Sequence, residues 1–214
     1  YRFLDDVTEI TVDTPYGPTS GPVHVGHLGD RTVAFLARHG ADHEFPPHLV
    51  PYRANVWALH SLGVVNVFGP CASGSLQAHV EPGHFVVPHQ LVDRSWGRPD
   101  SFFDGPVVHH VAFADPYDEA LRQVAVAACR DEDVTVHDAG TVVCVQGPRF
   151  STRAESQWFG SHGWEVINMT QHPEAVLCRE AGLRYAAIAL ITDFDAGLEG
   201  TGVAAVTQEE VFAF

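Results

Sequence analysis

Short apolar runs alternate with segments of helical spacing along almost the whole chain. The predicted strands are Pro22–His27 with Thr32–Ala37 (a hairpin around Leu28–Arg31), Val64–Phe68, Phe85–Val87 with Leu91–Val92, Thr141–Gln146, Val166–Met169 and Tyr185–Ile191. The predicted helices are Pro51–Leu62, Asp118–Cys129, Thr152–Gly163, Pro173–Ala181 and a last one from Thr207 to Phe214. Helices that alternate with buried strands are typical of an α/β domain with a largely parallel central sheet. The chain has 214 residues, the size of one domain, so we expect a single domain over residues 1–214.

Local signals support several of these elements. Pro51 stands at a first helical position, where its missing N–H costs nothing, and Gly63 follows as the end signal. Thr152 and Glu155 have the spacing of a capping box. The continuous apolar run Val64–Phe68 predicts a strand that is buried on both faces.

The charge balance narrows the choice of partners. Twelve basic residues stand against 27 acidic ones, which gives a formal net charge of −15. An acidic surface repels phosphate polymers and anionic lipid, so we expect neither a nucleic-acid nor a membrane partner. All twelve basic residues are arginine, which excludes Schiff-base chemistry and a phosphate-loop lysine.

Targeting and redox signals favour the cytoplasm. No apolar run reaches the roughly 18 residues that a membrane span needs. The start, Tyr1–Asp6, lacks the basic and apolar parts of a signal peptide. The four cysteines lie far apart, without a Cys-x-x-Cys pair, which is typical of reduced thiols in the cytosol.

Groups that can bind an anion follow two of the predicted strands. In an open α/β sheet, ligands collect at the carboxyl ends of the strands. Arg38 and His39 follow the hairpin; the arginine fork matches a phosphate or carboxylate, and an imidazole can donate to a second oxygen. The same two residues could equally be a surface pair without a role. The small residues Gly69–Ser75 follow Val64–Phe68, and they could form either an oxyanion-binding loop or a plain tight turn.

Acidic, hydroxyl and aromatic side chains follow three further strands. Asp193 and Asp195 could face a pocket together, with one carboxyl protonated as an acid, or they could form a turn or a helix cap. The remaining candidates are Met169 with Thr170, and Phe150 with Ser151 as a stacking ring and a hydrogen-bonding hydroxyl.

Other chemistries find less support. His39 and His43 have the spacing of a metal pair, and His109 and His110 lie together, but neither pair has further ligands at suitable spacing. No Gly-rich dinucleotide fingerprint or Gly-x-Ser-x-Gly elbow occurs, which weighs against dehydrogenases and hydrolases. The loop Asp93–Asp115 is long for a compact domain and is therefore a candidate for a functional role.

Taken together, the segments at the strand ends resemble a known family. The matching segments are Ala37–Gly40 with His43, Tyr52–Leu59, Gly74–Leu76, Gln146–Ser156, Asn168–Thr170 and Thr192–Asp195. They are similar to the 5′-methylthioadenosine phosphorylases, which belong to the trimeric purine nucleoside phosphorylases. The resemblance covers nearly the whole chain, in order, and the Gly147–Ser156 block is highly specific.

The resemblance implies a mixed-sheet α/β fold (the nucleoside phosphorylase fold), a homotrimer, no metal or organic cofactor, and inorganic phosphate as co-substrate. By position it implies a phosphate site made of Arg38, His39, the Cys71–Ala72 backbone and Thr170. It implies that the nucleoside is contacted by Phe150, Ser151, Met169, Asp193, Phe194, Asp195, His110 and Gln208. Within that set Asp193 would bind the purine amino group and protonate N7, with Asp195 alongside, and Met169 would contact the ribose. His110 would reach the 5′ pocket of a neighbouring subunit.

The sequence departs from the family pattern at a few places. Cys71 stands where many relatives have threonine. Gln208 stands where methylthio-specific relatives have an apolar residue and 6-oxopurine relatives a histidine. The Gly-rich opening loop of the family would precede Tyr1, and its C-terminal helix would extend beyond Phe214, so we expect this chain to lack both.

The activity that the resemblance implies is phosphate-dependent cleavage of 5′-methylthioadenosine to adenine and 5-methylthioribose 1-phosphate. Arg38 and His39 would hold phosphate below C1′, where it stabilises positive charge on the ribose and then attacks. The alternatives are a purine nucleoside phosphorylase acting on inosine, guanosine or methylthioinosine, a hydrolytic nucleosidase, and a non-catalytic nucleotide-binding or scaffold protein. A 6-oxopurine preference normally goes with asparagine at the Asp193 position, because a 6-oxo group needs a donor.

Overall fold

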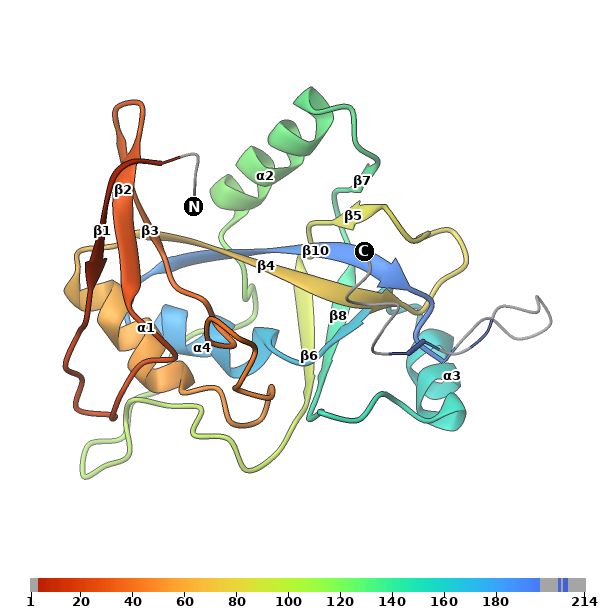
Figure 1. Cartoon of the computed structure of the whole chain (residues 1–214). Coiled ribbons are helices and arrows are strands. Elements are labelled where there is room, and N and C mark those ends of the chain that lie inside the picture. Colours follow the sequence, from red (N-terminus) through yellow and green to blue (C-terminus); the bar gives the residue numbers. More distant parts are fainter. Residues whose placement is uncertain (1–3, 197–203, 205, 208–214) are drawn as a thin grey trace.

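The computed structural model describes residues 4–196, 204, 206 and 207, and these residues form two sheets (Figure 1). The smaller sheet is antiparallel and has the order β1 (Asp5–Ile10), β2 (Val23–Leu28) and β3 (Arg31–Phe35). The larger sheet has the order β6-β8-β9-β4-β10-β5-β7. Its strands are β4 (Asn66–Ser75), β5 (Phe85–Val86), β6 (Gln90–Arg94), β7 (Val136–His137), β8 (Thr141–Val145), β9 (Val166–Asn168) and β10 (Arg184–Asp193).

The large sheet is mixed and largely parallel, as predicted. Its long central strands, β4 and β10, pair in parallel from Asn66 opposite Arg184 to Gly74 opposite Asp193. The pairs β5–β7, β6–β8 and β8–β9 are also parallel, whereas β10–β5 and β4–β9 are antiparallel. Because β9 runs against β4, the carboxyl end of β9 lies beside the middle of β4.

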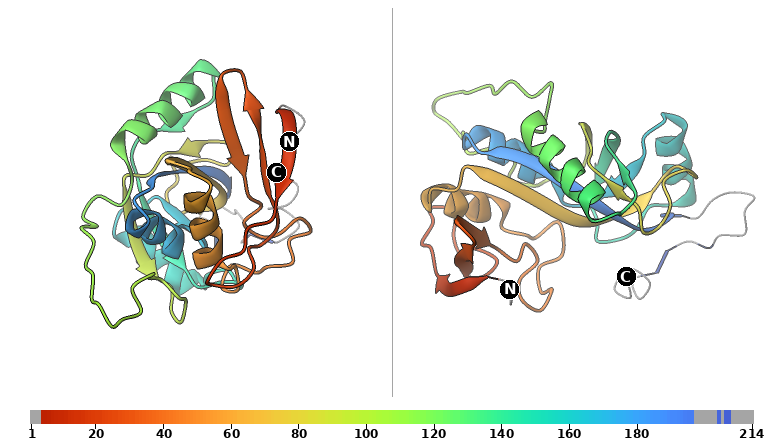
Figure 2. Two further views of the ribbon diagram at one scale, coloured as in Figure 1. Left: turned by 90° about the vertical axis from the view of Figure 1, so that its left-hand side faces the viewer. Right: turned by 90° about the horizontal axis from the view of Figure 1, so that it is seen from above.

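Helices cover both faces of the central strands (Figures 1 and 2). Within the described part these are α1 (Tyr52–Ser61), α2 (Glu119–Asp131), α3 (Arg153–Ser161) and α4 (Gln171–Glu180). Tyr185 of β10 packs in one core with Tyr52 of α1 and Leu177 of α4, whereas Ile188 packs against Val126 of α2. Since alternate side chains of a strand point to opposite faces, α1 and α4 lie on one face of β10 and α2 on the other. None of the described helices is long and apolar enough to cross a bilayer.

Most of the predicted elements are confirmed. The hairpin forms between β2 and β3, and the four complete predicted helices are present. The capping box is also present, because the Thr152 hydroxyl accepts from the Glu155 N–H and the Glu155 carboxylate accepts from the Thr152 N–H. Helix α4 begins at Gln171, ahead of the predicted start at Pro173. The helix predicted from Thr207 falls on residues 208–214, outside the described residues.

The run Gly69–Ser75 belongs to strand β4, so the predicted conformations, a tight turn or a loop, are wrong, whereas oxyanion binding by its backbone stays a prediction. The small residues are required by what packs against the strand. A Cβ at Gly69 would lie 2.2 Å from the Tyr185 hydroxyl, and a Cβ at Gly74 would lie 3.0 Å from an Asp193 carboxylate oxygen. The composition that suggests a turn therefore reflects close packing around β4.

Three other details of the pattern are also wrong. Val65, which precedes β4, and Phe68 within it are 56% and 41% exposed, so the run Val64–Phe68 is not buried on both faces. The two apolar runs around Pro88 form β5 and β6, which are not neighbours in the sheet. Strand β1 escapes prediction because five of its six residues are exposed and it has no apolar run.

Candidate active site

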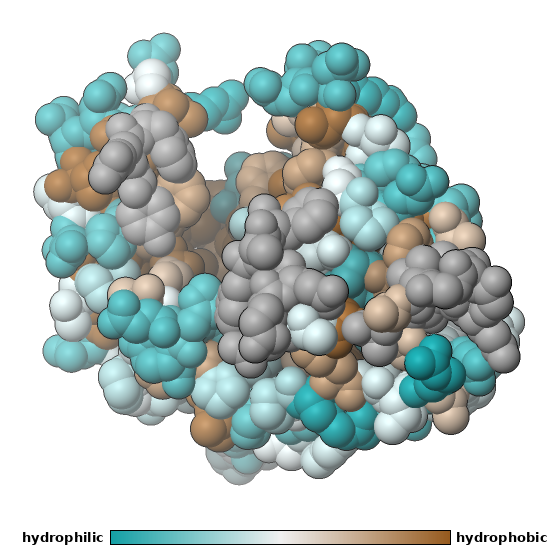
Figure 3. Space-filling view, turned by 45° about the vertical axis from the view of Figure 1, so that its right-hand side comes forward, coloured by the Kyte–Doolittle hydropathy of each residue, from teal (hydrophilic) through white to brown (hydrophobic). Residues whose placement is uncertain are grey.

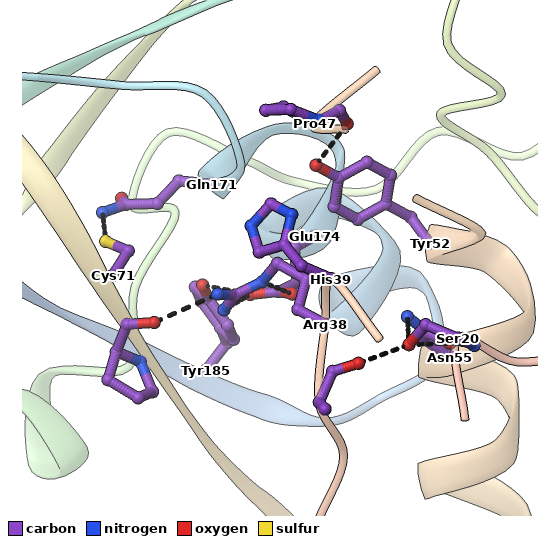
Figure 4. A network of polar contacts seen from close by, with 12 residues as sticks. Ser20, Arg38, His39, Pro47, Tyr52, Asn55, Cys71, Gln171, Glu174 and Tyr185 are labelled. Atoms are coloured by element: carbon purple, nitrogen blue, oxygen red, sulfur yellow. Dashed lines mark hydrogen bonds and ion pairs between the residues drawn. The ribbon is translucent and has the colours of Figure 1, made fainter. Parts of the chain in front are cut away.

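Strand β4 collects the candidate residues from several parts of the chain. Gly74 pairs with Asp193 of β10 on one side and with Ile167 of β9 on the other. Because β9 then runs back along β4, Asn168 and Gln171 reach Cys71, and their amide nitrogens lie 3.4 Å and 3.5 Å from its Sγ. Figure 4 shows the contact between Gln171 and Cys71. The Asn168–Thr170 segment and the Cys71–Ala72 segment are therefore neighbours, as the resemblance implies, although they do not meet at a common strand end.

Arg38 follows β3 and is held by a buried carboxylate. Its Nε donates to Glu174 Oε1 at 2.7 Å, its Nη2 donates to Glu174 Oε2 at 2.8 Å, and its Nη1 donates to the carbonyl oxygen of Pro70 at 3.1 Å (Figure 4). The two side chains are only 16% and 13% exposed. Burial alone would lower the pKa of Arg38, but Glu174 outweighs it and raises this pKa well above its ordinary value. Arg38 is therefore a largely buried and oriented cation and not an exposed surface residue.

His39 lies next to this ion pair as a neutral ring. Its Nδ1 is 2.8 Å from the carbonyl oxygen of Phe45, which can only accept, so Nδ1 carries the proton and donates. Burial and the nearby Arg38 charge lower the pKa of His39. The imidazole can therefore donate to an anion only through Nε2, and only after it takes up a second proton.

The His39 and His43 rings stack with centroids 5.5 Å apart. In the part of the chain that the structure describes, no group of three or more His, Cys, Asp or Glu side chains is arranged to hold a metal ion.

Cys71 and Ala72 lie on an edge of β4 that β9 leaves open. The pairing between β4 and β9 covers Gly74 and Ser75, whereas Cys71 and Ala72 pair with β10 on the other side. Thr170, at the start of α4, is 5% exposed, and its side chain does not cap the helix. Cys71 and Ala72 thus follow Pro70, which binds Arg38, and Thr170 stands between Asn168 and Gln171, which both contact Cys71.

Two carboxylates lie at the far end of β4. Asp193 Oδ2 accepts from the Thr192 hydroxyl at 2.7 Å, and Asp193 Oδ1 accepts from the Asp195 N–H at 2.6 Å. Asp195 is 4% exposed and accepts a hydrogen bond from the Ser156 hydroxyl. Burial, with the neighbouring Asp193 charge, raises the pKa of Asp195. Asp193 and Asp195 thus form a turn, one of the two arrangements that the sequence predicts. The same turn places the Asp195 carboxyl, with its raised pKa, beside Asp193.

The loop after β8 lies against the segment that contains Met169. A Cβ at Gly147 would lie 2.5 Å from the sulfur of Met169, and Gly147 has a φ of +63°, so glycine is needed there on two counts. Phe150 is 38% exposed, and Ser151 and Phe194 are half-buried. The loop with Phe150 and Ser151 is thus tied to the Met169 segment.

Two predicted residues are not placed in the site. His110 is exposed on the long loop, and within the described residues it forms no hydrogen bond or ion pair. Gln208 lies outside the described residues.

The pattern missed three polar side chains at the site. Glu174 binds Arg38, Tyr185 donates to Glu174 Oε2 at 2.7 Å, and Ser156 binds Asp195. A fourth missed residue is Arg98, which the long loop buries to 8% exposure. It donates to the carbonyl oxygens of Val145, Gln146, Met169 and His172 and to the Gln146 side chain. In the sequence, the unusual length of the loop Asp93–Asp115 was the signal that pointed to the segment containing Arg98.

The molecule has an apolar hollow on its surface and a separate cavity between its elements. In the space-filling view, apolar residues gather in a hollow between the β1–β3 sheet and the rest of the molecule (Figure 3). A cavity of about 850 Å³ lies elsewhere, between α2, α4 and the start of β10. Of the residues above, only Tyr185 lines this cavity, so it is separate from the candidate site.

Comparisons with known proteins agree with this geometry. A family model described as the phosphorylase superfamily matches residues 2–213. The chain is 58% identical to an S-methyl-5′-thioadenosine phosphorylase of Mycolicibacterium smegmatis, over 99% of this chain and 78% of that protein. It is 50% identical to a purine nucleoside phosphorylase of Streptomyces coelicolor, over 100% of this chain and 79% of that protein. The fold is similar to a methylthioadenosine phosphorylase from Schistosoma mansoni in complex with adenine, with a TM-score of 0.94, 38% identity, and coverage of 99% and 81% of the two chains.

Proposed function

The chain belongs to the phosphorylase superfamily, and from this premise we propose that it cleaves 5′-methylthioadenosine with inorganic phosphate. The products are adenine and 5-methylthioribose 1-phosphate. The relatives named S-methyl-5′-thioadenosine phosphorylase, at 58% and 55% identity over 99% of the chain, support this substrate.

The observation that carries the proposal is the order of groups along β4. The carbonyl of Pro70 binds Arg38, Cys71 adjoins the segment that contains Met169, and Gly74 adjoins Asp193. At about 3.3 Å per residue, Pro70 and Gly74 are about 13 Å apart. That length accommodates a phosphate, a ribose and a purine placed side by side.

At the phosphate end, Arg38, His39, Thr170 and the Cys71–Ala72 backbone bind the dianion. Phosphate held below C1′ stabilises the positive charge that builds on the ribose as the glycosidic bond breaks, and it then attacks C1′. No step here requires a metal or an organic cofactor, and we propose that phosphate is the only co-substrate.

At the purine end, Asp193 accepts from the 6-amino group and gives a proton to N7, so that the base departs neutral. Asp195, whose pKa is raised by burial, lies beside Asp193 and donates its backbone N–H to the Asp193 carboxylate. Met169 contacts the ribose, and Phe150, Ser151 and Phe194 contact the base.

The second candidate is a purine nucleoside phosphorylase for 6-oxopurine nucleosides such as inosine, guanosine or methylthioinosine. The observation in its favour is the relative with that name at 50% identity over the whole chain. A carboxylate at position 193 suits an amino group better, because an ionised carboxylate can only accept.

An assay of base release distinguishes the two candidate phosphorylase functions from each other and from hydrolysis. Methylthioadenosine, adenosine, inosine and methylthioinosine are each incubated with and without phosphate, and the free base and sugar 1-phosphate are quantified. We expect methylthioadenosine to be the best substrate and release to require phosphate. Release without phosphate assigns a hydrolase instead, and a preference for inosine assigns the second candidate.

We propose further that residues 1–214 act as one phosphorylase domain in a cytoplasmic homotrimer, with His110 and Gln208 at the 5′ pocket. His110 is exposed, as a residue that reaches a neighbouring subunit must be in a single chain. Light scattering at assay concentration tests the assembly, and a fully active monomer would contradict it.

A further inference from the structure

We propose that Glu174 is a positioning residue for phosphate: it holds the Arg38 guanidinium in the orientation that meets the anion, and Tyr185 fixes Glu174 in turn. This inference rests on the proposed function and adds to it two residues that do not touch the substrate themselves. It comes from the contacts around Arg38 and not from the residue pattern.

The contacts orient the guanidinium completely. Glu174 takes the N–H groups of Nε and Nη2 in a two-point contact, and the Pro70 carbonyl takes one N–H of Nη1. The described residues thus use three of the five N–H groups of Arg38. The two that are left belong to Nη1 and Nη2, and the bond to Pro70 places Nη1 beside the Cys71 segment.

Glu174 is itself held in place. Tyr185 donates to its Oε2 at 2.7 Å from β10, on the same face as α4. Burial and the Glu174 charge raise the pKa of Tyr185 well above its ordinary value, so this hydroxyl remains a donor. Gly69 leaves the space for both groups, because a Cβ there would lie 2.2 Å from the Tyr185 hydroxyl and 2.9 Å from Glu174 Oε2.

Charge gives Glu174 two opposite effects on phosphate. Its carboxylate repels an incoming dianion, but without it the buried Arg38 would lose its partner and its fixed direction. The ion pair is close to neutral, so phosphate must be recognised by directed N–H groups more than by net charge. We therefore expect that the loss of orientation outweighs the relief of repulsion.

The test compares Glu174→Gln and Tyr185→Phe with the wild type. Glutamine keeps the size of the side chain but has only one acceptor oxygen, and phenylalanine removes only the hydroxyl that fixes Glu174. The control is Glu119→Gln, which removes another arginine-paired carboxylate at an exposed position on α2. For each variant, the KM for phosphate, the KM for methylthioadenosine, kcat and the rise of Tm with added phosphate are measured.

For Glu174→Gln we expect the KM for phosphate to rise about tenfold or more, as for the loss of a charge-assisted hydrogen bond. For Tyr185→Phe we expect a smaller rise of about threefold, because Glu174 keeps both contacts to Arg38 and loses only the hydrogen bond that fixes it. In both variants the KM for methylthioadenosine should stay within about twofold of the wild type, and the rise of Tm with phosphate should shrink. Glu119→Gln should match the wild type.

Two results would overturn the inference. One is a phosphate KM that is unchanged or lower in both variants, which would mean that Glu174 only opposes the anion. The other is a parallel rise of both KM values with a lower Tm, which would make the role merely structural. A wild-type protein that needs no phosphate would instead overturn the proposed function, so the two failures are distinguishable.

Discussion

The phosphate end and the purine end of the proposed site differ in how they hold buried charge. At the phosphate end, Arg38 is paired with the carboxylate of Glu174 through two hydrogen bonds. At the purine end, the carboxyl groups of Asp193 and Asp195 lie side by side, and Asp193 accepts the N–H of Asp195. Opposite charges meet beside the middle of β4, and like charges lie at its carboxyl end.

The difference separates two kinds of chemistry. The opposite charge of Glu174 favours the charged form of Arg38 and raises the pKa of Arg38 despite its burial. Such a group binds an anion and exchanges no proton. Like charges in a buried place make one group hold its proton more tightly, and the pKa of Asp195 is raised. This contrast supports the proposal that the proton for the leaving purine comes from the second end.

The largest effect should come from removing the cation at the phosphate end. Arg38→Met leaves Glu174 buried without its partner, and breaking a buried ion pair costs about 3–5 kcal/mol. We expect urea unfolding to show a loss of this size. The double variant Arg38→Met/Glu174→Leu should recover part of it, because no buried charge is left. A loss below about 1 kcal/mol in the single variant would contradict the view that this pair is a tightly coupled unit.

The sequence predicts the parts of the fold that depend on local pattern. Helices with their own end signals, such as the one capped by Thr152 and Glu155, appear where predicted. Strand β4 contains glycine, proline and serine, which in a sequence suggest a turn. In the structure, Tyr185 and Asp193 pack against its glycines, and this packing explains the small residues. The cause of that composition is tertiary, so no local pattern could show it.

The candidate site also has a part that the sequence predicts and a part that only the fold reveals. Arg38 and Asp193 could be identified because charged residues at strand ends are chemically conspicuous. Glu174 in a helix and Tyr185 in an apolar strand are ordinary in a sequence, and only the fold brings them to Arg38. The roles of the predicted site residues remain predictions, and substitutions at the purine end test them most sharply.

The second effect concerns Asp193. Asparagine at this position offers an N–H donor that suits a 6-oxo group and cannot protonate N7. We expect Asp193→Asn to lower kcat/KM for methylthioadenosine by about 10² or more, the usual size for the loss of a positioned general acid. Preference should shift toward inosine and methylthioinosine, since a mismatched buried polar pair costs about 1–3 kcal/mol.

Both bases must be measured in the same variant, because a folding defect lowers the two rates equally. An unchanged ratio between 6-amino and 6-oxo substrates would show that Asp193 does not select the base. The purine end would then owe its chemistry to another group, and the contrast with the phosphate end would lose its functional meaning.

The smallest effect is on stability and concerns Asp195. The folded protein holds the Asp195 proton more tightly than the unfolded chain does, because burial raises its pKa above the ordinary value of 3.8. The contribution of Asp195 to the stability of the wild type therefore falls as pH rises from about 3.8 through the raised pKa, and it is fully lost above that pKa. Asp195→Asn does not titrate, so its unfolding free energy relative to the wild type should increase across that pH window and then level off.

Ser156→Ala sharpens the test. The Ser156 hydroxyl lowers the pKa of Asp195, so its removal should extend the pH window of the effect to higher pH. A difference between Asp195→Asn and the wild type that stays constant with pH would show that Asp195 titrates normally, and the purine end would then lack the proton-holding group that sets it apart from Arg38 and Glu174.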